Sequence, residues 1–427
     1  TKNDLNNIGA TLKAGSAMAL DVGDKLNNSS TTHHSESQAG QSNAWRTGID
    51  QIGQIYVGDG LKDKKDENGR PLTTLSIDVT GDATFNAGQL VNAGGASRLV
   101  AQGDMAFNAV NTGYQTNAIG DSNNYYKVGQ TQDVGSVLVT SGDTFIKGNN
   151  VTGTATTIQS GGNTIINADN NIAFKEGRAT QNLSTANRTT DKGFLSSKTT
   201  QDRYDMTSDT AIGSHIDGDK VSITAKNDVH LTATDVISDH GTYVKAGNNL
   251  TIDAAENRYS ESSSHDKKKS GVFGTGSGLD FTIGSQKTQN QNSTKQTWHT
   301  GSNIGTNDGN TVLMVGNHYQ QTGSVVSAGN ESNNNVHDLS RGTVIINAKS
   351  ATIQNTTATT ESHSSQSQKT TGLTVSVSNS LVDHVQGIRS VVKSGETTNS
   401  DQMKVMAGVA AVAKTRTLRN KIGRAHV

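Results

Sequence analysis

The sequence predicts an all-β protein: a right-handed parallel β-helix (β-solenoid) with β-hairpin excursions and a short helical segment near the C-terminus. Three observations predict it: few apolar residues, short segments of alternating hydrophobicity, and turns that recur every 20 to 22 residues. Only 31% of the 427 residues are hydrophobic, against about 45–50% in ordinary soluble domains. Such a chain cannot build a thick core. Stacked coils need only a thin one, because hydrogen bonds between neighbouring coils supply much of the order.

A short motif marks the turns. It consists of Gly, three variable residues, an apolar residue and Asn-Ala, and looser copies begin with Asn or Asp. These three residue types tolerate a positive φ angle best, so each copy is expected to begin at a turn. The copies begin at Gly81, Gly103, Gly162, Asp219, Asn227, Asn248 and Gly342.

Short strands are expected after these turns. Apolar residues alternate, for example at Val221, Ile223 and Ala225, and a two-residue period predicts a half-buried strand. Like turns lie 22 residues apart at Gly81 and Gly103. Each repeat is therefore expected to form one coil of about three short strands, stacked at about 4.8 Å on the next coil. An antiparallel β-sandwich also has many short strands, but its turns need not recur at a fixed spacing.

Polar stretches rich in Ser and Thr interrupt the coils at residues 180–192, 260–270 and 359–371. Each is followed by Gly and an apolar residue, at Phe194, Val272 and Leu373. We expect these stretches to leave the solenoid as long β-hairpins and to return to it.

Two further segments complete this pattern of excursions. Residues 271–283 are expected to begin a second arm, which runs through residues 286–300 and re-enters the solenoid near Val312. Residues 29–38 (SSTTHHSESQ) resemble an earlier and less regular copy.

Composition excludes several classes of protein. The absence of Cys rules out disulfides, thiolate metal sites and thiol nucleophiles. A net charge of −1 does not provide the excess of positive charge that nucleic-acid binding needs. No run of 18 apolar residues occurs, so no membrane-spanning helix is expected. The chain begins with Thr and shows no signal segment, which suggests an internal fragment whose export signal lies upstream.

Catalytic and metal-binding motifs are also missing from the sequence. There is no HExxH and no GxSxG, and the 12 His residues are expected at exposed positions of the excursions. Asp82, Asp104 and Asp143 each follow a turn Gly; stacked carboxylates can bind Ca²⁺, but turn chemistry is the favoured interpretation. The sequence therefore predicts no catalytic residue, no metal and no cofactor.

Two features are candidates for surface contact. Lys267, Lys268 and Lys269 form a basic run that would suit an anionic lipid or glycan, with a solvated loop as the alternative. Trp298 lies on an excursion and could contact a sugar or a membrane interface, with local packing at the hairpin base as the alternative.

A family resemblance follows from the order of these motifs. Residues 223–278, 323–330 and 342–377 carry AGN-type strands, a polar SES-type excursion and a return through Gly and an apolar residue. This order resembles the haemagglutinin repeats of two-partner-secreted exoproteins, the filamentous haemagglutinin and contact-dependent growth inhibition effector family.

The resemblance implies a function. Such a protein would be exported by an Omp85-type outer-membrane transporter, its two-partner transporter, and displayed on a Gram-negative cell surface or secreted. It would serve as a repeat stalk in adhesion or in contact-dependent delivery of a C-terminal toxin, without catalysis in this segment. Its partners would be a target-cell receptor, a glycan or an outer membrane. The alternative is a β-helical polysaccharide-degrading enzyme, which would need clustered carboxylates in an aromatic-lined groove.

The sequence predicts five regions. They are an irregular β-solenoid with a polar excursion (1–74), β-solenoid coils (75–175), haemagglutinin-type repeats with long hairpins (176–378), a helical segment (379–420) and a suspected artefactual tail (421–427). The helix is predicted because Leu381, Val385, Ile388 and Val392 share one helical face.

Overall fold

The computed structural model describes residues 1–194, 196–274, 281–329 and 342–375. These residues contain strands and turns, and none of them lies in a helix suited to crossing a membrane. The chain divides into two compact units: Thr1–Gly271 with Ser285–Thr371, and Val272–Gly284 with Gly372–Val427. Of the second unit, the structure describes only the backbone at the ends of three strands. The predicted helical segment (379–420) and tail (421–427) lie outside the described residues.

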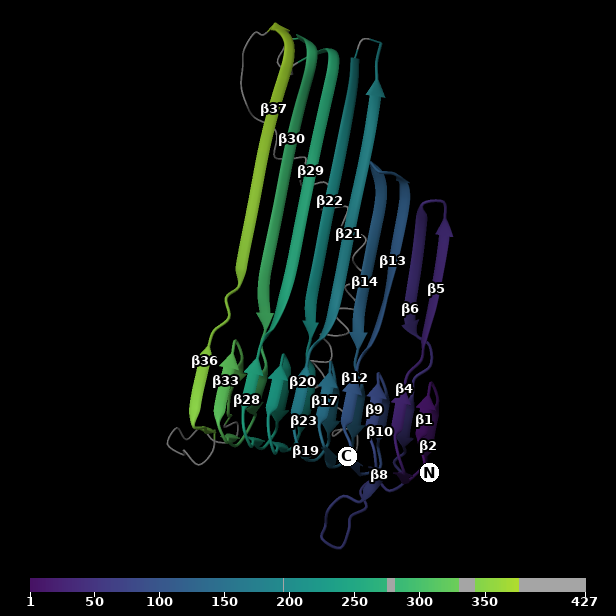
Figure 1. The fold of residues 1–427 in the computed structure, drawn as a ribbon, viewed down its shortest axis with the longest axis vertical. Coiled ribbons are helices and arrows are strands. Elements are labelled where there is room, and N and C mark those ends of the chain that lie inside the picture. The colour runs from purple at the N-terminus through teal and green to yellow at the C-terminus, as the bar shows by residue number, and fades with distance from the viewer. Residues whose placement is uncertain (195, 275–280, 330–341, 376–427) are drawn as a thin grey trace, which may run out of the picture. The chain divides into compact units, whose positions relative to one another are not determined.

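Three parallel sheets build the solenoid in the first unit (Figure 1). In spatial order, sheet A contains β1 (Leu5–Ile8), β4 (Leu26–Ser29), β9 (Ala83–Asn86), β12 (Met105–Asn108), β17 (Val151–Thr154), β20 (Ile172–Lys175), β25 (Val229–Thr232), β28 (Leu250–Asp253), β33 (His318–Thr322) and β36 (Ser350–Gln354).

Sheets B and C follow the same order of coils. Sheet B contains β2 (Thr11–Ala14), β7 (Gln54–Val57), β10 (Gln89–Asn92), β15 (Val137–Thr140), β18 (Thr157–Ser160), β23 (Ser214–Gly218), β26 (Thr234–Ser238), β31 (Asn303–Thr306) and β34 (Val325–Val326). Sheet C contains β3 (Met18–Val22), β8 (Thr73–Val79), β11 (Ala96–Ala101), β16 (Thr144–Gly148), β19 (Thr164–Ala168), β24 (Val221–Ala225), β27 (Thr242–Ala246), β32 (Thr311–Val315) and β35 (Val344–Asn347).

One coil therefore consists of one strand from each sheet. Each strand pairs in parallel with its equivalent in the next coil: Leu5 lies opposite Leu26, and Val229 opposite Leu250. Both pairs are separated by 21 residues, as the turn spacing predicted. The parallel β-helix is confirmed.

The core is a thin column of stacked side chains. Residues that alternate along the strands point inward, so that Ile77, Leu99, Ile146 and Ile166 are fully buried. The rings of Phe85 and Phe107, in neighbouring coils, stack with centroids 5.1 Å apart.

The corner between sheets A and B alternates between two forms. In every second coil a single residue with positive φ turns the chain: Gly9, Ala87, Ala155, Ala233 and Gly323. Gly81 and Gly103 lie at bends between strands, as the motif predicted, and neither has a positive φ angle. Glycine is needed there for close approach, since a Cβ on Gly103 would lie 2.3 Å from an oxygen of Asp82 in the preceding coil.

In the intervening coils the same corner opens into an excursion. The excursions form one antiparallel sheet, here called the excursion sheet. Its spatial order is β37 (Thr359–Val375), β30 (Phe281–Thr300), β29 (Ala255–Gly274), β22 (Ser196–Ile212), β21 (Gly177–Lys192), β14 (Asn124–Val134), β13 (Val110–Asp121), β6 (Ser42–Ile49) and β5 (Thr32–Ala39).

The structure corrects the predicted excursions in two places. The hairpin of β13 and β14 was not predicted, because residues 75–175 were expected to contain coils alone. The chain also re-enters the solenoid at β31, earlier than the predicted re-entry near Val312.

Simple geometry explains why the hairpins join into one sheet. Strands in a sheet lie about 4.8 Å apart, and stacked coils have the same spacing. A hairpin is two strands wide, so it fills the rise of two coils. Hairpins that leave alternate coils therefore meet edge to edge, and β21 pairs with β14 on one side and β22 on the other.

The hairpins also lengthen along the chain. Their first strands contain 8 residues in β5, 12 in β13, 16 in β21 and 20 in β29. The free end of the β21–β22 hairpin consequently extends beyond those of β13–β14 and β5–β6 (Figure 1).

Candidate functional site

Polar side chains from four strands meet on one face of the excursion sheet. Cross-strand partners point to the same side of a sheet. Arg188 of β21 lies opposite Gln201 of β22, and Gln201 lies opposite Asp266 of β29. Lys268 and Arg203 differ from these partners by two residues along their strands, so they share this face.

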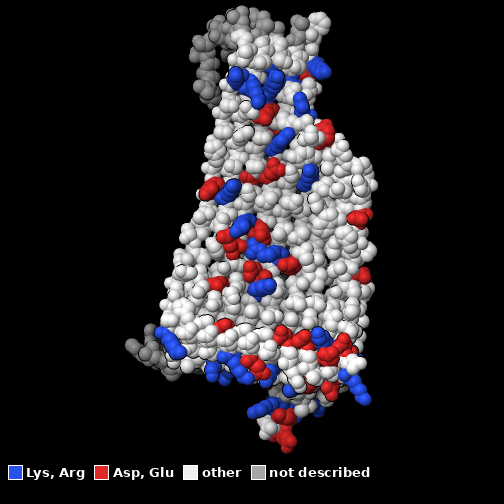
Figure 2. Space-filling model, in the orientation of Figure 1, with Lys and Arg blue, Asp and Glu red and all other residues white. Residues whose placement is uncertain are grey.

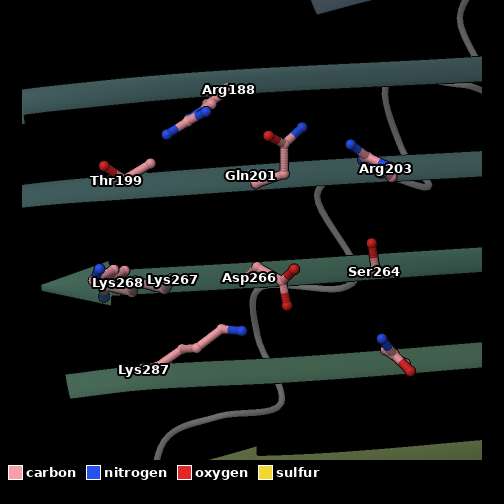
Figure 3. A pocket seen from close by; sticks show the side chains of 10 residues that line it. Arg188, Thr199, Gln201, Arg203, Ser264, Asp266, Lys267, Lys268 and Lys287 are labelled. Carbon is pink, nitrogen blue, oxygen red and sulfur yellow. The ribbon is translucent and has the colours of Figure 1, made fainter. Parts of the chain in front are cut away.

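These residues surround a shallow hollow of about 440 Å³, here called the basic hollow (Figure 3). Its lining consists of Arg188, Thr199, Gln201, Arg203, Ser264, Asp266, Lys267, Lys268, Lys287 and Gln291. All ten side chains are polar or charged. The hollow lies toward the free ends of the hairpins, where Lys and Arg gather (Figure 2).

Positive charge dominates this lining. Five of its residues are Lys or Arg, and Asp266 is its one carboxylate. Arg188, Arg203, Lys268 and Lys287 are exposed, and none of them forms an ion pair within 4.0 Å with a carboxylate of the described residues. An anionic ligand would meet several cations that form no close ion pair with these carboxylates.

Asp266 supplies a different feature. Its Oδ1 is shielded from solvent and has no hydrogen-bond partner in the described structure. A shielded carboxylate oxygen without a donor costs free energy. The hollow thus combines free cations with one unsatisfied acceptor.

The predicted basic run is divided between two faces. Lys268 faces the basic hollow. Lys267 borders it, but pairs with Thr200 on the alternate face, where Lys198 and Lys269 also lie. Burial, and then the charges of Lys269 and Lys198, lower the pKa of Lys267.

Trp298 lies far from this run. It is half-buried near the end of β30, close to the solenoid, whereas Lys287 lies near the other end of the same strand. The two are eleven positions apart along β30, or about 36 Å at about 3.3 Å per residue. The structure does not bring Trp298 and the Lys run together, and the role of Trp298 in contact stays a prediction.

Sequence analysis missed Arg188, Arg203 and Lys287 as site residues. Which cations share a face depends on the register within and between two separate hairpins, β21–β22 and β29–β30, and no local pattern carries that information.

The expectation that His residues lie on exposed excursions was wrong for four of them. His215, His230, His240 and His318 lie in the solenoid. Three contact Asp side chains; His215 Nε2 lies 3.2 Å from Asp217 Oδ2. The hydrogen bond with Asp217 raises the pKa of His215, and burial opposes the rise.

The turn carboxylates form hydrogen bonds between coils. Asp104 accepts from the side chains of Asn149 and Asn150, at 3.0 and 2.8 Å. Burial raises the pKa of Asp104, but these hydrogen bonds together lower it by more, so the net shift is downward. The same corner continues with amides, where Asn171 Oδ1 accepts from the Asp228 N–H at 3.1 Å. In the described ranges, no three His, Asp or Glu side chains gather as metal ligands would.

The chain is similar in sequence to several known proteins. Residues 192–340 match the family model of the hemagglutinin repeat. The chain is 26% identical over 357 residues to the tRNA nuclease CdiA-2 of Burkholderia pseudomallei strain 1026b, covering 79% of this chain and 11% of that protein. It is 33% identical over 186 residues to the 16S rRNA endonuclease CdiA of Enterobacter cloacae, covering 38% and 6%. No solved structure matches.

A β-helix with polar hairpins at alternate coils defines a repeat-built β-solenoid segment. Residues 192–340 match the hemagglutinin repeat and the chain is similar to CdiA proteins, so the predicted resemblance to the haemagglutinin repeats of two-partner-secreted exoproteins is confirmed. It spans about a tenth to a quarter of the length of the first relatives it matches.

Proposed function

We propose that this chain is the repeat stalk of a secreted or surface-displayed bacterial exoprotein, acting in adhesion or in contact-dependent delivery of a C-terminal toxin. One observation carries the proposal. The same β-helix with alternate hairpins runs through most of the described chain, and 79% of the chain aligns with a protein named as a tRNA nuclease CdiA. The relative's nuclease activity would reside outside this segment, which we propose has no catalytic role.

The mode of export fits the same proposal. An Omp85-type transporter would pass the chain unfolded, and a chain without Cys carries no disulfide to block passage. Coils can then form one after another outside the cell, since each contacts only its neighbours. A receptor, a glycan or the outer membrane of a target cell would be the partner reached. Within the stalk, residues 176–378 would form the haemagglutinin-type repeats.

A chimaeric exoprotein tests delivery. This chain replaces the aligned segment of the Enterobacter cloacae CdiA, and inhibitor cells carrying the chimaera are grown with target cells. We expect target counts to fall, as with the unaltered relative. A chimaera lacking the segment should be displayed but inactive. If that deletion inhibits as well as the intact chimaera does, the segment has no part in delivery.

A further inference from the structure

We propose that the basic hollow binds a phosphorylated polysaccharide, with Arg188, Arg203, Lys268 and Lys287 holding phosphate groups and the neighbouring polar side chains holding sugar hydroxyls. Binding as such does not depend on the proposed function. Its role in contact with a target cell rests on that function.

The arrangement of the cations favours a polymer that carries several phosphates. The four residues come from four successive strands, one from each of β21, β22, β29 and β30. Four strands span about 14 Å at about 4.8 Å per step. Charge-assisted hydrogen bonds to phosphate are about twice as strong as neutral ones. A single phosphate cannot reach all four groups, whereas successive phosphates along a chain can.

The uncharged residues of the lining favour a sugar as the other part of the ligand. Gln201, Gln291, Ser264 and Thr199 offer amide and hydroxyl groups that both donate and accept hydrogen bonds. Asp266, which also lines the hollow, has a carboxylate that accepts hydrogen bonds, and an anion cannot supply the donor. A sugar hydroxyl can. The ligand that satisfies the whole lining therefore carries both phosphates and hydroxyls.

The lining argues against a membrane surface. Membrane-binding faces combine basic residues with apolar side chains that enter the acyl region. No side chain that lines the basic hollow is apolar. The fully exposed Phe194, at the turn between β21 and β22, lies outside the lining, so phospholipid is tested directly as the competing ligand.

The experiment measures binding of the purified chain to phosphomannan, with unphosphorylated mannan alongside. We expect binding to phosphomannan alone. The double variant Lys268→Gln/Lys287→Gln should lose affinity by at least about tenfold, because it loses charged donors to phosphate. The control Lys198→Gln/Lys269→Gln removes the same charge from the opposite face and should stay within about twofold of the wild type. Unchanged circular dichroism would show that both variants fold.

Asp266→Ala separates the sugar contact from the charge. We expect weaker binding to phosphomannan, because the carboxylate that accepts a hydrogen bond from a sugar hydroxyl is lost. Binding to inorganic phosphate should be unchanged or tighter, because the negative charge that repels phosphate is also lost. Tighter binding of Asp266→Ala to phosphomannan would overturn the sugar assignment. Equal losses in the two double variants would show diffuse attraction and overturn the site.

Phosphatidylglycerol vesicles provide the last arm. If the chain binds them at equal phosphate concentration as tightly as phosphomannan, and the Lys268/Lys287 variant loses both, the ligand is a phosphate on any surface and the polysaccharide proposal fails. A chain that binds phosphomannan but delivers no toxin in the chimaera would leave this site in place and remove the proposed function.

Discussion

His215 links the stability of the solenoid to pH. Its Nε2 lies 3.2 Å from Asp217 Oδ2, and this hydrogen bond, followed by the charges of Asp217 and Asp235, raises the pKa of His215 above 6.5 against the effect of burial. A raised pKa in the folded state means that the protonated ring stabilises the fold. This contribution is complete below the unfolded pKa and disappears as the pH rises through the folded pKa.

We predict that His215→Asn lowers the free energy of unfolding in acid and has a decreasing effect as the pH rises. Chemical denaturation of both proteins, from about pH 5 to about pH 9, measures the difference. His33→Asn serves as the control because that ring is exposed on strand β5. A His215 effect that stays constant over this range would show that the ion pair contributes nothing.

Asn171 belongs to a ladder of amide side chains at the corner between sheets C and A. Its Oδ1 accepts hydrogen bonds from Asn227 Nδ2 at 2.9 Å and from the Asp228 N–H at 3.1 Å. We predict that Asn171→Ala destabilises the protein by about 1–2 kcal/mol, because both donors lose their partner. Thermal unfolding checks this prediction. Asn171→Asp should cost less, since a carboxylate oxygen occupies the equivalent place at Asp228, where it accepts from the Asn249 N–H.

At the scale of elements, Gly153 in β17 makes room for a neighbouring coil. A Cβ at this position would lie 2.4 Å from a ring carbon of Phe174. We predict that Gly153→Ala costs about 1–3 kcal/mol through overpacking of the core. Gly48→Ala, in β6, meets no atom within 4 Å and should be nearly neutral. Equal melting temperatures for the two variants would contradict this account.

Local patterns predicted the coils but not all of the corners. Alternating residues such as Val221 and Ile223 mark strands wherever they occur, so their pairing needed only the repeat length. The positive φ of Ala87 and Ala155 had no local signature, because Ala seldom adopts that conformation. The geometry of the corner between sheets A and B imposes this positive φ. The β13–β14 hairpin was missed because it lacks the dense Ser and Thr of the later hairpins.

Less of the candidate site than of the fold could be predicted from the sequence. Lys268 was identified from a run of charge, which is a local feature. Its companion Arg188 lies on the neighbouring hairpin and Lys287 on the other strand of its own hairpin, and antiparallel register alone places them beside it. Register depends on how far each hairpin extends from the solenoid, which is set by packing between hairpins.

At the scale of the whole molecule, the alternation of plain and hairpin-bearing coils is a constraint on folding. Deleting residues 229–249 removes one plain coil and brings two hairpins one strand spacing too close. Deleting residues 172–249 removes a hairpin-bearing coil together with a plain one and keeps the alternation. We predict that the larger deletion folds better than the smaller one.

Limited proteolysis and denaturant unfolding measure this difference. The larger deletion should unfold cooperatively and resist cleavage within β29 and β30. The smaller deletion should be cleaved there, because those strands lose their pairing with β22. Comparable protection in both proteins would show that the hairpins fold independently of their spacing.

The match between one hairpin and two coils also bears on the history of the gene. A duplication that adds a single repeat would misplace every hairpin after it, whereas one that adds two repeats with their hairpin leaves the sheet continuous. Unequal crossing-over can therefore lengthen such a gene in steps of paired repeats, and surviving alleles should differ by whole pairs.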